Sequence, residues 1–295
     1  MTGKEATKPM TQMPEAPTPQ PNPRPVTPGE PARSTRRWRG PAKSVATSNT
    51  VIALASAALL LSVWEYFGRD VNPIFASHPT AIVGAFGRLF EDGTLPGAFF
   101  DSMRPMAVGY GIAAAVGIPL GLLIGRYRTA EAALGFYVTG GYATPMVAFI
   151  PLLMLWFGLG FAVKVAVVVL MTLFPIVINT WAGVQAVPKT LIEVGQTFVA
   201  PQSAIMRKII LPATVPYIMT GLRLGVGRAV IGIVIAEFFS AIGGLGGVII
   251  RSGQRFDTAS LFVPIVILMV LGIGLTKAVG YLESRVAPWQ RETSG

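Results

Sequence analysis

The sequence has no cysteine, a single histidine (His78) and few charges, since Asp, Glu, Lys and Arg make up only 13% of its 295 residues. The lack of cysteine excludes disulfides, thiolate metal sites and cysteine nucleophiles, and one histidine excludes a histidine-rich metal site. A soluble domain carries about 25% charged residues. Here 52% of the residues are hydrophobic and the mean hydropathy is +0.58. We therefore expect most of the chain to lie in lipid, without metal or cofactor.

The first 50 residues differ from the rest. They hold 10 of the 24 prolines, eight Lys or Arg and three Glu, which predicts a disordered tail. The tail ends in a basic cluster: Arg33, Arg36, Arg37, Arg39 and Lys43. Nucleic-acid binding is one interpretation, but no aromatic platform or folded module accompanies these charges. A cytoplasmic anchor next to a membrane helix is favoured, and no nucleic-acid partner is expected.

Six apolar runs are long enough to cross a bilayer: Val51–Phe67, Met106–Gly125, Ala132–Gly158, Val163–Val184, Ala213–Ala241 and Leu261–Tyr281. At about 1.5 Å per residue the first run extends about 27 Å, close to the thickness of a bilayer core. It begins too far into the chain for a cleavable signal peptide. The sequence thus predicts an all-α, polytopic membrane protein with about six transmembrane helices. The membrane domain covers residues 51–285, and a short tail, 286–295, follows it.

A short amphipathic helix is predicted between the first two runs. Pro79–Phe90 carries its apolar residues on one helical stripe, with a start at His78-Pro79 and a stop at Asp92-Gly93. Because His78 has no neighbouring ligand residues in the sequence, we interpret it as a structural or capping residue rather than a metal ligand.

The distribution of Lys and Arg predicts the orientation. If the N-terminus is cytoplasmic, the inside carries the tail cluster and these residues: Arg126, Arg128, Lys189, Arg207, Lys208, Arg285 and Arg291. The outside then carries Arg69, Arg88, Arg251 and Arg255. This agrees with the positive-inside rule. Both termini are therefore expected in the cytoplasm, together with the polar loop of residues 185–212.

Charged residues within the runs are few. Lys164 and Lys277 lie near span ends, where a lysine can snorkel to the interface. Arg223, Arg228 and Glu237 all lie on the fifth run and are expected to face protein or water, which makes them candidates for a translocation path. For the two arginines a structural role, snorkelling and a path role all remain open. Glu237, near the outer end, is an unconvincing lone proton carrier.

No segment reads as a nucleotide-binding loop, G-x-x-x-x-G-K-[ST]. The glycine-rich stretch 243–247 falls between spans, and a turn or re-entrant segment is a better interpretation of it than a phosphate cradle. No His, Asp and Glu cluster has catalytic spacing, so the chain is not expected to be an enzyme.

The 185–212 loop contains a recognisable motif. It reads Glu193-Val194-Gly195 and then Ile209-Ile210-Leu211-Pro212. This resembles the permease subunits of binding-protein-dependent ABC importers, whose signature is E-A-A, a glycine four positions later, and I-x-L-P. Val194 and Gly195 replace the alanines, and Val199 replaces the glycine. Because a β-branched residue disfavours φ > 0, we expect the turn to shift to Ala200-Pro201.

Further segments place the resemblance in the nitrate, sulfonate and taurine branch. They are Ile150–Leu153, Trp156–Gly160, Phe174–Val184 and Pro216–Arg228. The resemblance covers about residues 75–285 continuously and in the same order along the chain. The family has the type I importer permease fold. It implies a second permease copy, expected as a homodimer, two ABC ATPase subunits and a periplasmic or lipid-anchored substrate-binding protein.

In the family, Glu193 belongs to the segment that meets the ATPase, and Arg207 and Lys208 could add charge contacts. Thr190–Phe198 and Gln202–Ile210 are predicted as two short helices, with the loop ending at Leu211-Pro212. The implied function is ATP-driven import of a small solute (nitrate, a sulfonate, taurine or a vitamin precursor) across the inner membrane, with ATP hydrolysis on a separate subunit. A stand-alone channel or secondary transporter for a small anion is the alternative.

Overall fold

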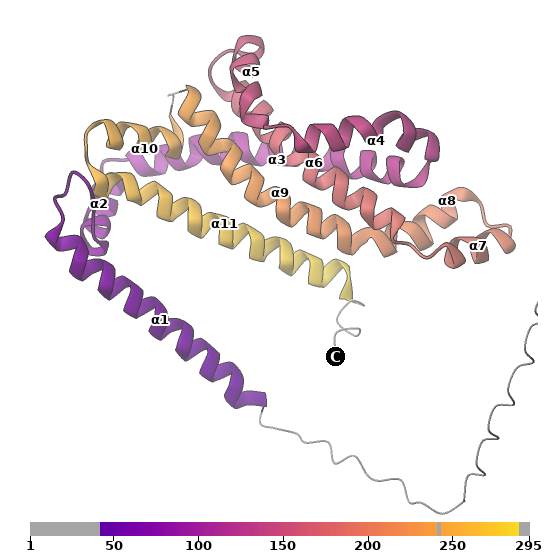
Figure 1. The fold of residues 1–295 in the computed structure, drawn as a ribbon, viewed down its shortest axis with the longest axis horizontal. Coiled ribbons are helices and arrows are strands. Elements are labelled where there is room, and N and C mark those ends of the chain that lie inside the picture. Colours follow the sequence, from indigo (N-terminus) through magenta and orange to yellow (C-terminus); the bar gives the residue numbers. More distant parts are fainter. Residues whose placement is uncertain (1–41, 241–242, 289–295) are drawn as a thin grey trace, which may run out of the picture. The chain divides into compact units, whose positions relative to one another are not determined.

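The computed structural model describes residues 42–240 and 243–288, and over these residues the chain consists of helices and their connections. It divides into two units, Met1–Ala53 and Leu54–Gly295, and the features below belong to the second. The predicted tail residues 1–41 and 289–295 lie outside the described residues. In chain order (Figure 1) the elements are α1 (Ala42–Asp70), α2 (Pro79–Glu91), α3 (Thr94–Arg126), α4 (Arg128–Ala143), η1 (Met146–Phe149), α5 (Ile150–Phe157), α6 (Phe161–Gln185), α7 (Lys189–Thr197), α8 (Gln202–Ile205), η2 (Met206–Ile210), α9 (Leu211–Ser240), α10 (Gly244–Gln254) and α11 (Thr258–Val286).

Five of these helical stretches are long and apolar enough to span a membrane: Val51–Asp70, Thr94–Arg126, Phe161–Gln185, Gln202–Ser240 and Thr258–Val286. A sixth span is counted only if the bent pair of α4 with η1 and α5 is taken as one. The predicted number of about six is therefore confirmed, and so is the short helix over 79–91 with its stop at Asp92-Gly93.

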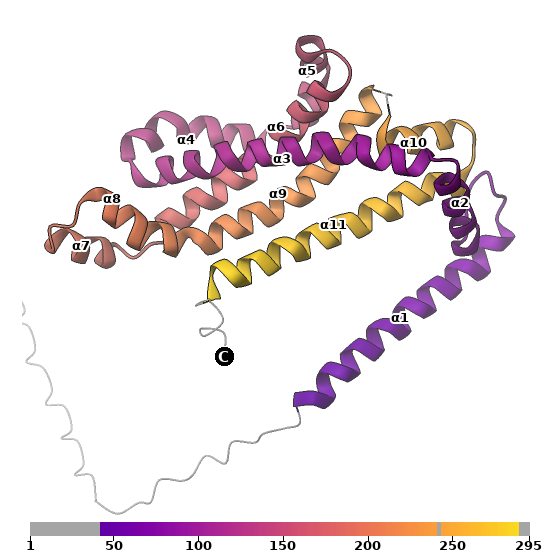
Figure 2. The ribbon, with the colours of Figure 1, turned by 180° about the vertical axis from the view of Figure 1, so that it is seen from behind.

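The third predicted span, Ala132–Gly158, which Gly140-Gly141, Pro145 and Pro151 interrupt in the sequence, is a broken helix. It bends by 94° between Ala143 and Met146. Thr144 has an extended backbone, with φ −74° and ψ 137°. The cause is Pro145, because proline disfavours helical geometry in the residue before it. As a result α5 leaves the direction of α4 at a steep angle, as both views show (Figures 1 and 2), and packs on α6 and α9.

The second predicted span starts earlier than expected. The helix begins at Thr94 rather than Met106 and includes Pro105 and Pro119 in its interior. Its polar first turns pack in the protein, with Ser102 fully buried. Prolines inside membrane helices are tolerated where neighbouring helices support the freed backbone groups.

α6 lies between α3 and α9 and makes the most extensive helix pairs with both. On α3, small residues recur every four positions along the face toward α6, which allows close approach. A Cβ atom added at Gly121 would lie 2.6 Å from Cβ of Thr180, and one at Gly125 would lie 2.5 Å from Cβ of Val184. The two backbones therefore touch along most of the shared length.

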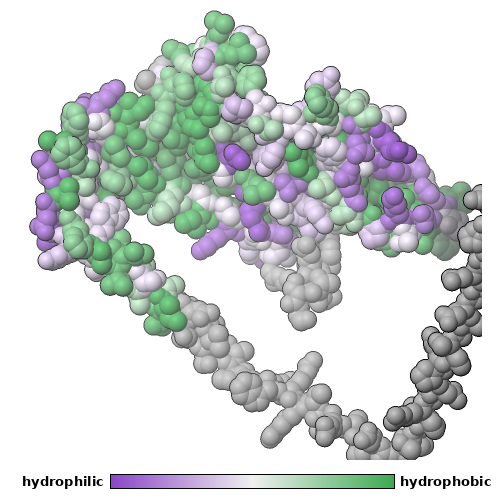
Figure 3. Space-filling view, viewed as in Figure 1, coloured by the Kyte–Doolittle hydropathy of each residue, from purple (hydrophilic) through white to green (hydrophobic). Residues whose placement is uncertain are grey.

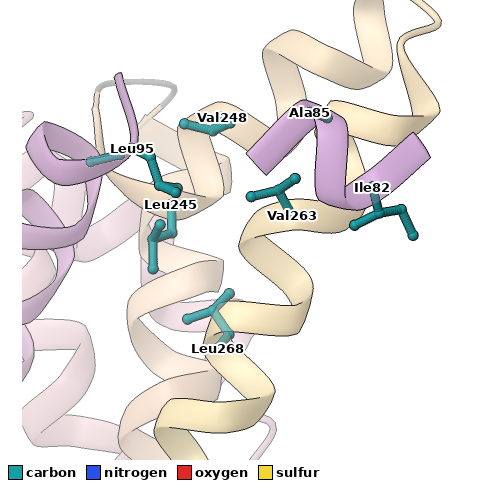
Figure 4. Packing of buried hydrophobic residues seen from close by; sticks show 8 residues of the cluster. Ile82, Ala85, Leu95, Leu245, Val248, Val263 and Leu268 are labelled. Carbon is teal, nitrogen blue, oxygen red and sulfur yellow. The ribbon is translucent and has the colours of Figure 1, made fainter. Parts of the chain in front are cut away.

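A separate apolar cluster joins α2, α3, α10 and α11 (Figure 4). Its buried members are Ile82, Ala85, Leu95, Ala98, Leu245, Val248, Val263 and Leu268. Of the apolar stripe predicted for 79–90, Ile82 is buried in this cluster and Leu89 packs partly against it, whereas Val83, Phe86 and Phe90 are exposed. Hydrophilic residues gather on the visible surface at this end and around α7 and α8, with hydrophobic surface between them (Figure 3).

Candidate functional site

The 185–212 loop is a helical hairpin. α7 ends in a turn in which the Ala200 N–H bonds the Gly195 carbonyl (3.0 Å) and the Val199 N–H bonds the Gln196 carbonyl (2.8 Å). This pair of bonds is a Schellman motif, with Val199 at the position that is usually glycine in the left-handed conformation. Val199 has φ 54°. The predicted shift of the turn to Ala200-Pro201 is therefore wrong: the valine adopts the strained conformation because two backbone bonds close around it.

The hairpin is fastened to the spans by a buried apolar cluster formed by Val184, Val187, Ile205 and Ile210. Gly195 faces this cluster, and a Cβ at Gly195 would come within 3.2 Å of both Ile205 Cγ1 and Ile209 Cδ1. The replacement of the family's alanine by glycine thus lets α7 lie close to the second arm. Arg126 also donates to Gln202 Oε1, and Gln185 donates to Glu131 Oε1 (2.9 Å).

The opposite face of the hairpin is uncovered. Leu191, Val194, Phe198 and Val199 are exposed, Phe198 at 81% and Val199 at 88%. Glu193 lies on the same helix and is also exposed, as are Arg207 and Lys208 on the second arm. Of the predicted loop residues, Gly195 is buried, and Ile209, Leu211 and Pro212 are partly buried in the attachment to the spans. The hairpin thus combines a buried anchor with an exposed apolar face flanked by charges of both signs.

The loop does not end at Leu211-Pro212 as predicted. α8, η2 and α9 form one uninterrupted helical stretch from Gln202 to Ser240. Residues 206–210 are a π-helix, whose wider turn makes room for the Pro212 ring and its missing N–H. A displacement of the hairpin is therefore carried directly into a membrane span.

Glu237 lies near the other end of α9 in a fully buried network. Its carboxylate accepts from Lys164 Nζ (3.0 Å), from Ser102 Oγ (2.8 Å to Oε1) and from the Gly246 N–H (2.9 Å). Ser102 Oγ in turn accepts from the Leu245 N–H (2.9 Å). We call Ser102, Lys164, Glu237 and the two N–H groups the Glu237 network. The prediction that Lys164 snorkels is wrong, because this side chain is 5% exposed and forms an ion pair.

The glycine-rich stretch 243–247 serves this network. It forms the start of α10, where the Gly246 N–H bonds the Glu237 carboxylate and the Leu245 N–H bonds Ser102 Oγ. Gly244 and Gly246 lie against the Glu237 side chain, whereas Gly243 lies next to Asp101 and Gly247 next to Arg251. Gly244 has φ +74°, and a Cβ there would lie 1.9 Å from Glu237 Oε1. Only glycine allows α10 to begin against a buried carboxylate from another helix.

The two arginines on α9 differ in their surroundings. Arg223 forms an ion pair with Glu283 of α11. Arg228 is exposed and, within the described residues, has no ion pair. It lines a cavity of about 190 Å³ at the break between α4 and η1. The three predicted path residues are thus not brought together: Glu237 is enclosed by protein, Arg223 is paired, and Arg228 faces open space.

Sequence reasoning missed the partners of these charges. Ser102 lies 135 residues from Glu237, and Lys164 lies 73 residues from it. A signal was present, since a lysine and a glutamate buried in separate spans each need a counter-charge.

His78 lies at the N-cap position of α2. Its Nδ1 is 2.9 Å from Thr80 Oγ1 and 3.3 Å from Glu65 Oε1. The sequence did not indicate this contact between α1 and α2.

Comparison with known families gives a match of residues 117–288 to the model of the binding-protein-dependent transport system inner membrane component. The chain is 32% identical over 239 residues to the formylaminopyrimidine transport permease protein ThiX of Halalkalibacterium halodurans, covering 79% of this chain and 94% of the relative. It is 28% identical over 265 residues to the taurine transport system permease protein TauC of Escherichia coli, covering 87% and 94%. The riboflavin transport system permease protein RibX of Chloroflexus aurantiacus is 30% identical over 261 residues, covering 88% and 94%.

The fold is also found among solved structures. A chain of the MetNI methionine ABC transporter, in an inward-facing conformation, superposes with a TM-score of 0.54 at 18% identity. The match covers 65% of this chain and 94% of that chain. The two chains therefore share a helical fold.

Proposed function

Because the chain belongs to the binding-protein-dependent transport system inner membrane components and is thus the permease subunit of an ABC importer, we propose that it imports a small solute of the sulfonate, taurine, nitrate or vitamin-precursor class. The family works with separate ATPase subunits and a substrate-binding protein, so this chain does not itself hydrolyse ATP. We further propose that two copies of the chain form the pathway, with two ATPase subunits bound at the 185–212 loops. The substrates named for the relatives, taurine and formylaminopyrimidine among them, support this range.

One observation carries the proposed role of the loop: an exposed apolar face on a hairpin whose other face is anchored in the spans. Exposed Phe198 and Val199 at the tip of a polar loop are costly in water, and such patches mark protein interfaces. Glu193 on the same helix and Arg207 and Lys208 on the second arm are exposed as well, and charged residues are typical of the rim of an interface. An ATPase groove would cover the apolar face and pair with these charges.

The continuous stretch Gln202–Ser240 supplies the mechanical link in this proposal. An ATPase that closes on ATP moves the hairpin, and the buried cluster around Ile205 and Ile210 passes the movement to α9 as a near-rigid body. Such a movement switches the pathway between inward-facing and outward-facing states. The excess of Lys and Arg on the loop side supports a cytoplasmic location for the loop and both termini.

Copurification tests the role of the loop. The tagged chain is isolated from membranes in mild detergent as wild type, as Glu193→Lys and as Glu91→Lys, which makes the same charge change at the end of α2, also exposed. We expect the ATPase with wild type and Glu91→Lys, and its loss or uncoupling with Glu193→Lys. If no ATPase accompanies wild type, and the purified chain alone carries flux in vesicles, the protein acts as a channel or secondary transporter.

A second pair of variants tests the apolar contact. Phe198 and Phe136 are equally exposed, at 81%, but Phe136 lies on α4, outside the 185–212 loop. Aromatic anchors at interface centres typically cost more than about 1 kcal/mol when truncated. Phe198→Ala is therefore expected to weaken ATPase binding about tenfold, with Phe136→Ala at the wild-type value. Equal effects of both variants would remove the apolar face from the interface.

A further inference from the structure

Arg228 is a charged residue exposed in the middle of a membrane span. It follows the start of α9 at Leu211 by 17 residues, about 26 Å along the helix. Arg223, one and a half turns earlier, is neutralised by Glu283. Arg228 has no such ion pair in the described part of the chain. A mid-span charge is costly in lipid and is found facing protein or a water-filled cavity, so the surroundings of Arg228 indicate what it faces.

The space beside Arg228 is formed by the broken helix. Tyr142 and Thr144 come from the end of α4, Met146 from η1, and Phe174 and Pro175 from α6. Arg228 is the one ionised side chain that lines this cavity of about 190 Å³. The Thr144 hydroxyl donates to the Gly140 carbonyl (2.8 Å), so its proton is already used within α4. The cavity therefore offers a guanidinium, a phenol and apolar walls.

The broken helix is fixed in place beside Arg228 because α5 packs against a later part of α9. Ile150 and Leu153 of α5 pack with Met171 of α6 and with Ala236, which lies two turns beyond Arg228 on α9. Broken membrane helices characteristically surround substrate sites in transporters, because their irregular backbone must line a cavity rather than lipid. Arg228 also belongs to the stretch Gln202–Ser240 that begins in the 185–212 loop, so a movement of the loop shifts the guanidinium relative to α4.

We propose that this cavity is an anion site of the translocation path, in which Arg228 contacts the oxyanion group of a small acid such as an alkanesulfonate. This inference rests on the proposed transport function and narrows its substrate class. A guanidinium matches sulfonate and carboxylate oxygens in a bidentate manner. Typical ligand pockets have volumes of about 300–1,000 Å³. At about 30 Å³ per water-sized group, this cavity takes roughly six such groups, which fits a short sulfonate and is too small for a riboflavin-sized ring system.

A purely structural role for Arg228 is the competing explanation. The last carbonyls of α4 lie beside the cavity, and a cation near a helix C-terminus is favourable. In that case the cavity need not admit an anion at all. The two explanations differ in whether an anion reaches the cavity from water and whether Arg228 draws it there.

Cysteine accessibility distinguishes them, because the chain has no native cysteine. Thr144→Cys places the single thiol of this chain in the cavity wall, and the full-length chain is reconstituted in lipid nanodiscs together with the subunits that copurify with it. The rate of thiol modification is measured with an anionic sulfonatoethyl thiosulfonate and a cationic trimethylammonium analogue. We expect the anionic reagent to modify this thiol about ten times faster than the cationic reagent does. Adding Arg228→Ala should abolish the preference, whereas Arg228→Lys should retain it and Arg223→Ala should leave it unchanged.

Protection completes the test. Ethanesulfonate is expected to slow the anionic reagent at Thr144→Cys, and the neutral ethyl methyl sulfone is not. An unreactive thiol, a preference that survives Arg228→Ala, or equal protection by both compounds would each overturn the anion site. Labelling does not require ATP hydrolysis, so its result is independent of copurification: an ATPase-bound complex without anion preference refutes the site alone, and anion preference without a bound ATPase refutes the importer coupling alone.

Discussion

The two ends of the stretch Gln202–Ser240 are built in opposite ways. At the Ser240 end, Glu237 is enclosed by Ser102, Lys164 and two backbone N–H groups, with glycines fitted around its carboxylate. At the Gln202 end, the hairpin exposes Phe198 and holds Val199 in a conformation that a β-branched residue disfavours. At the Ser240 end the Glu237 carboxylate finds its partners within this chain, whereas the Gln202 end leaves apolar surface uncovered.

This difference indicates where the chain is fixed and where it depends on another protein. The Glu237 network joins α3, α6, α9 and α10, so it ties four helices into one body. A buried ion pair with additional hydrogen bonds gains little stability as such, but removing one member is expensive. The hairpin has the reverse property: its exposed residues contribute little to the fold of the isolated chain, and their effect appears on binding a partner.

The largest expected effect comes from breaking the Glu237 network. Glu237→Leu leaves Lys164 charged and buried without a counter-charge, and leaves the Gly246 N–H unpaired. Removing one partner of a buried ion pair costs about 3–5 kcal/mol. We expect a sharp loss of folded protein and a lower unfolding midpoint in detergent, measured by thermal denaturation of the purified chain.

The double variant Lys164→Met with Glu237→Leu serves as the control. It removes both charges, so it should recover part of the stability lost in Glu237→Leu. A double variant as unstable as the single one would show that packing or the backbone bonds, rather than the unpaired lysine, determine the loss.

The second effect in size tests the close approach at Gly244. Gly244→Ala puts a Cβ 1.9 Å from Glu237 Oε1 in a backbone of φ +74°, which forces α10 away from the carboxylate. We expect a loss of about 2–3 kcal/mol, in the range for overpacking a well-packed site. Gly227 on α9 has no atom within 4 Å of its Cβ position, so Gly227→Ala should be neutral or slightly stabilising through helix propensity. Similar unfolding midpoints for the two variants would contradict the role of Gly244.

The hairpin at the Gln202 end and the Glu237 network at the Ser240 end were not equally predictable from the sequence. Periodicity and hydropathy are local, so the existence of the long helices and the bounds of the amphipathic α2 were predictable, whereas the start of α3 at Thr94, well before Met106, was not. The loop motif could be recognised because Glu193 and Ile209–Pro212 stand at the spacing of the importer permease signature. The Glu237 network joins residues more than 70 positions apart, and no local pattern reports that pairing. The break at Thr144-Pro145 was visible only as a proline within an apolar run, which many membrane helices tolerate.

A third, smaller effect concerns the pH dependence of the free energy of unfolding, through the carboxylate that precedes α11. Asp257 precedes α11, and its Oδ1 accepts from the Ser260 N–H (3.0 Å). Partial burial raises the pKa of Asp257, but the bonds to Ser260 and the charges of Arg88 and Arg255 outweigh it and hold the pKa below its ordinary value.

Because its folded pKa is depressed, Asp257 contributes stability above its unfolded pKa, and the contribution is lost as the pH falls below about 4. Asp257→Ala should cost about 1 kcal/mol near neutral pH, as loss of a helix cap does, and should flatten the acid dependence of the unfolding midpoint. The matched variant Asp257→Asn keeps a side-chain oxygen for the Ser260 N–H, so it should lose less stability near neutral pH than Asp257→Ala while flattening the acid dependence equally.

The smallest expected effect is at the opposite end, at Val199. A left-handed conformation costs a non-glycine residue about 1–2 kcal/mol, and glycine loses about 0.5–1 kcal/mol through its greater freedom in the unfolded chain. Val199→Gly should therefore stabilise the hairpin by under about 1 kcal/mol, seen as slower hydrogen exchange at the Ala200 N–H that bonds Gly195. Val199→Ala keeps the left-handed backbone without glycine's freedom and should give little of this gain. Faster exchange in Val199→Gly would mean that the valine side chain stabilises the turn despite its backbone, and the hairpin would then be as closely adapted to its residues as the Glu237 network.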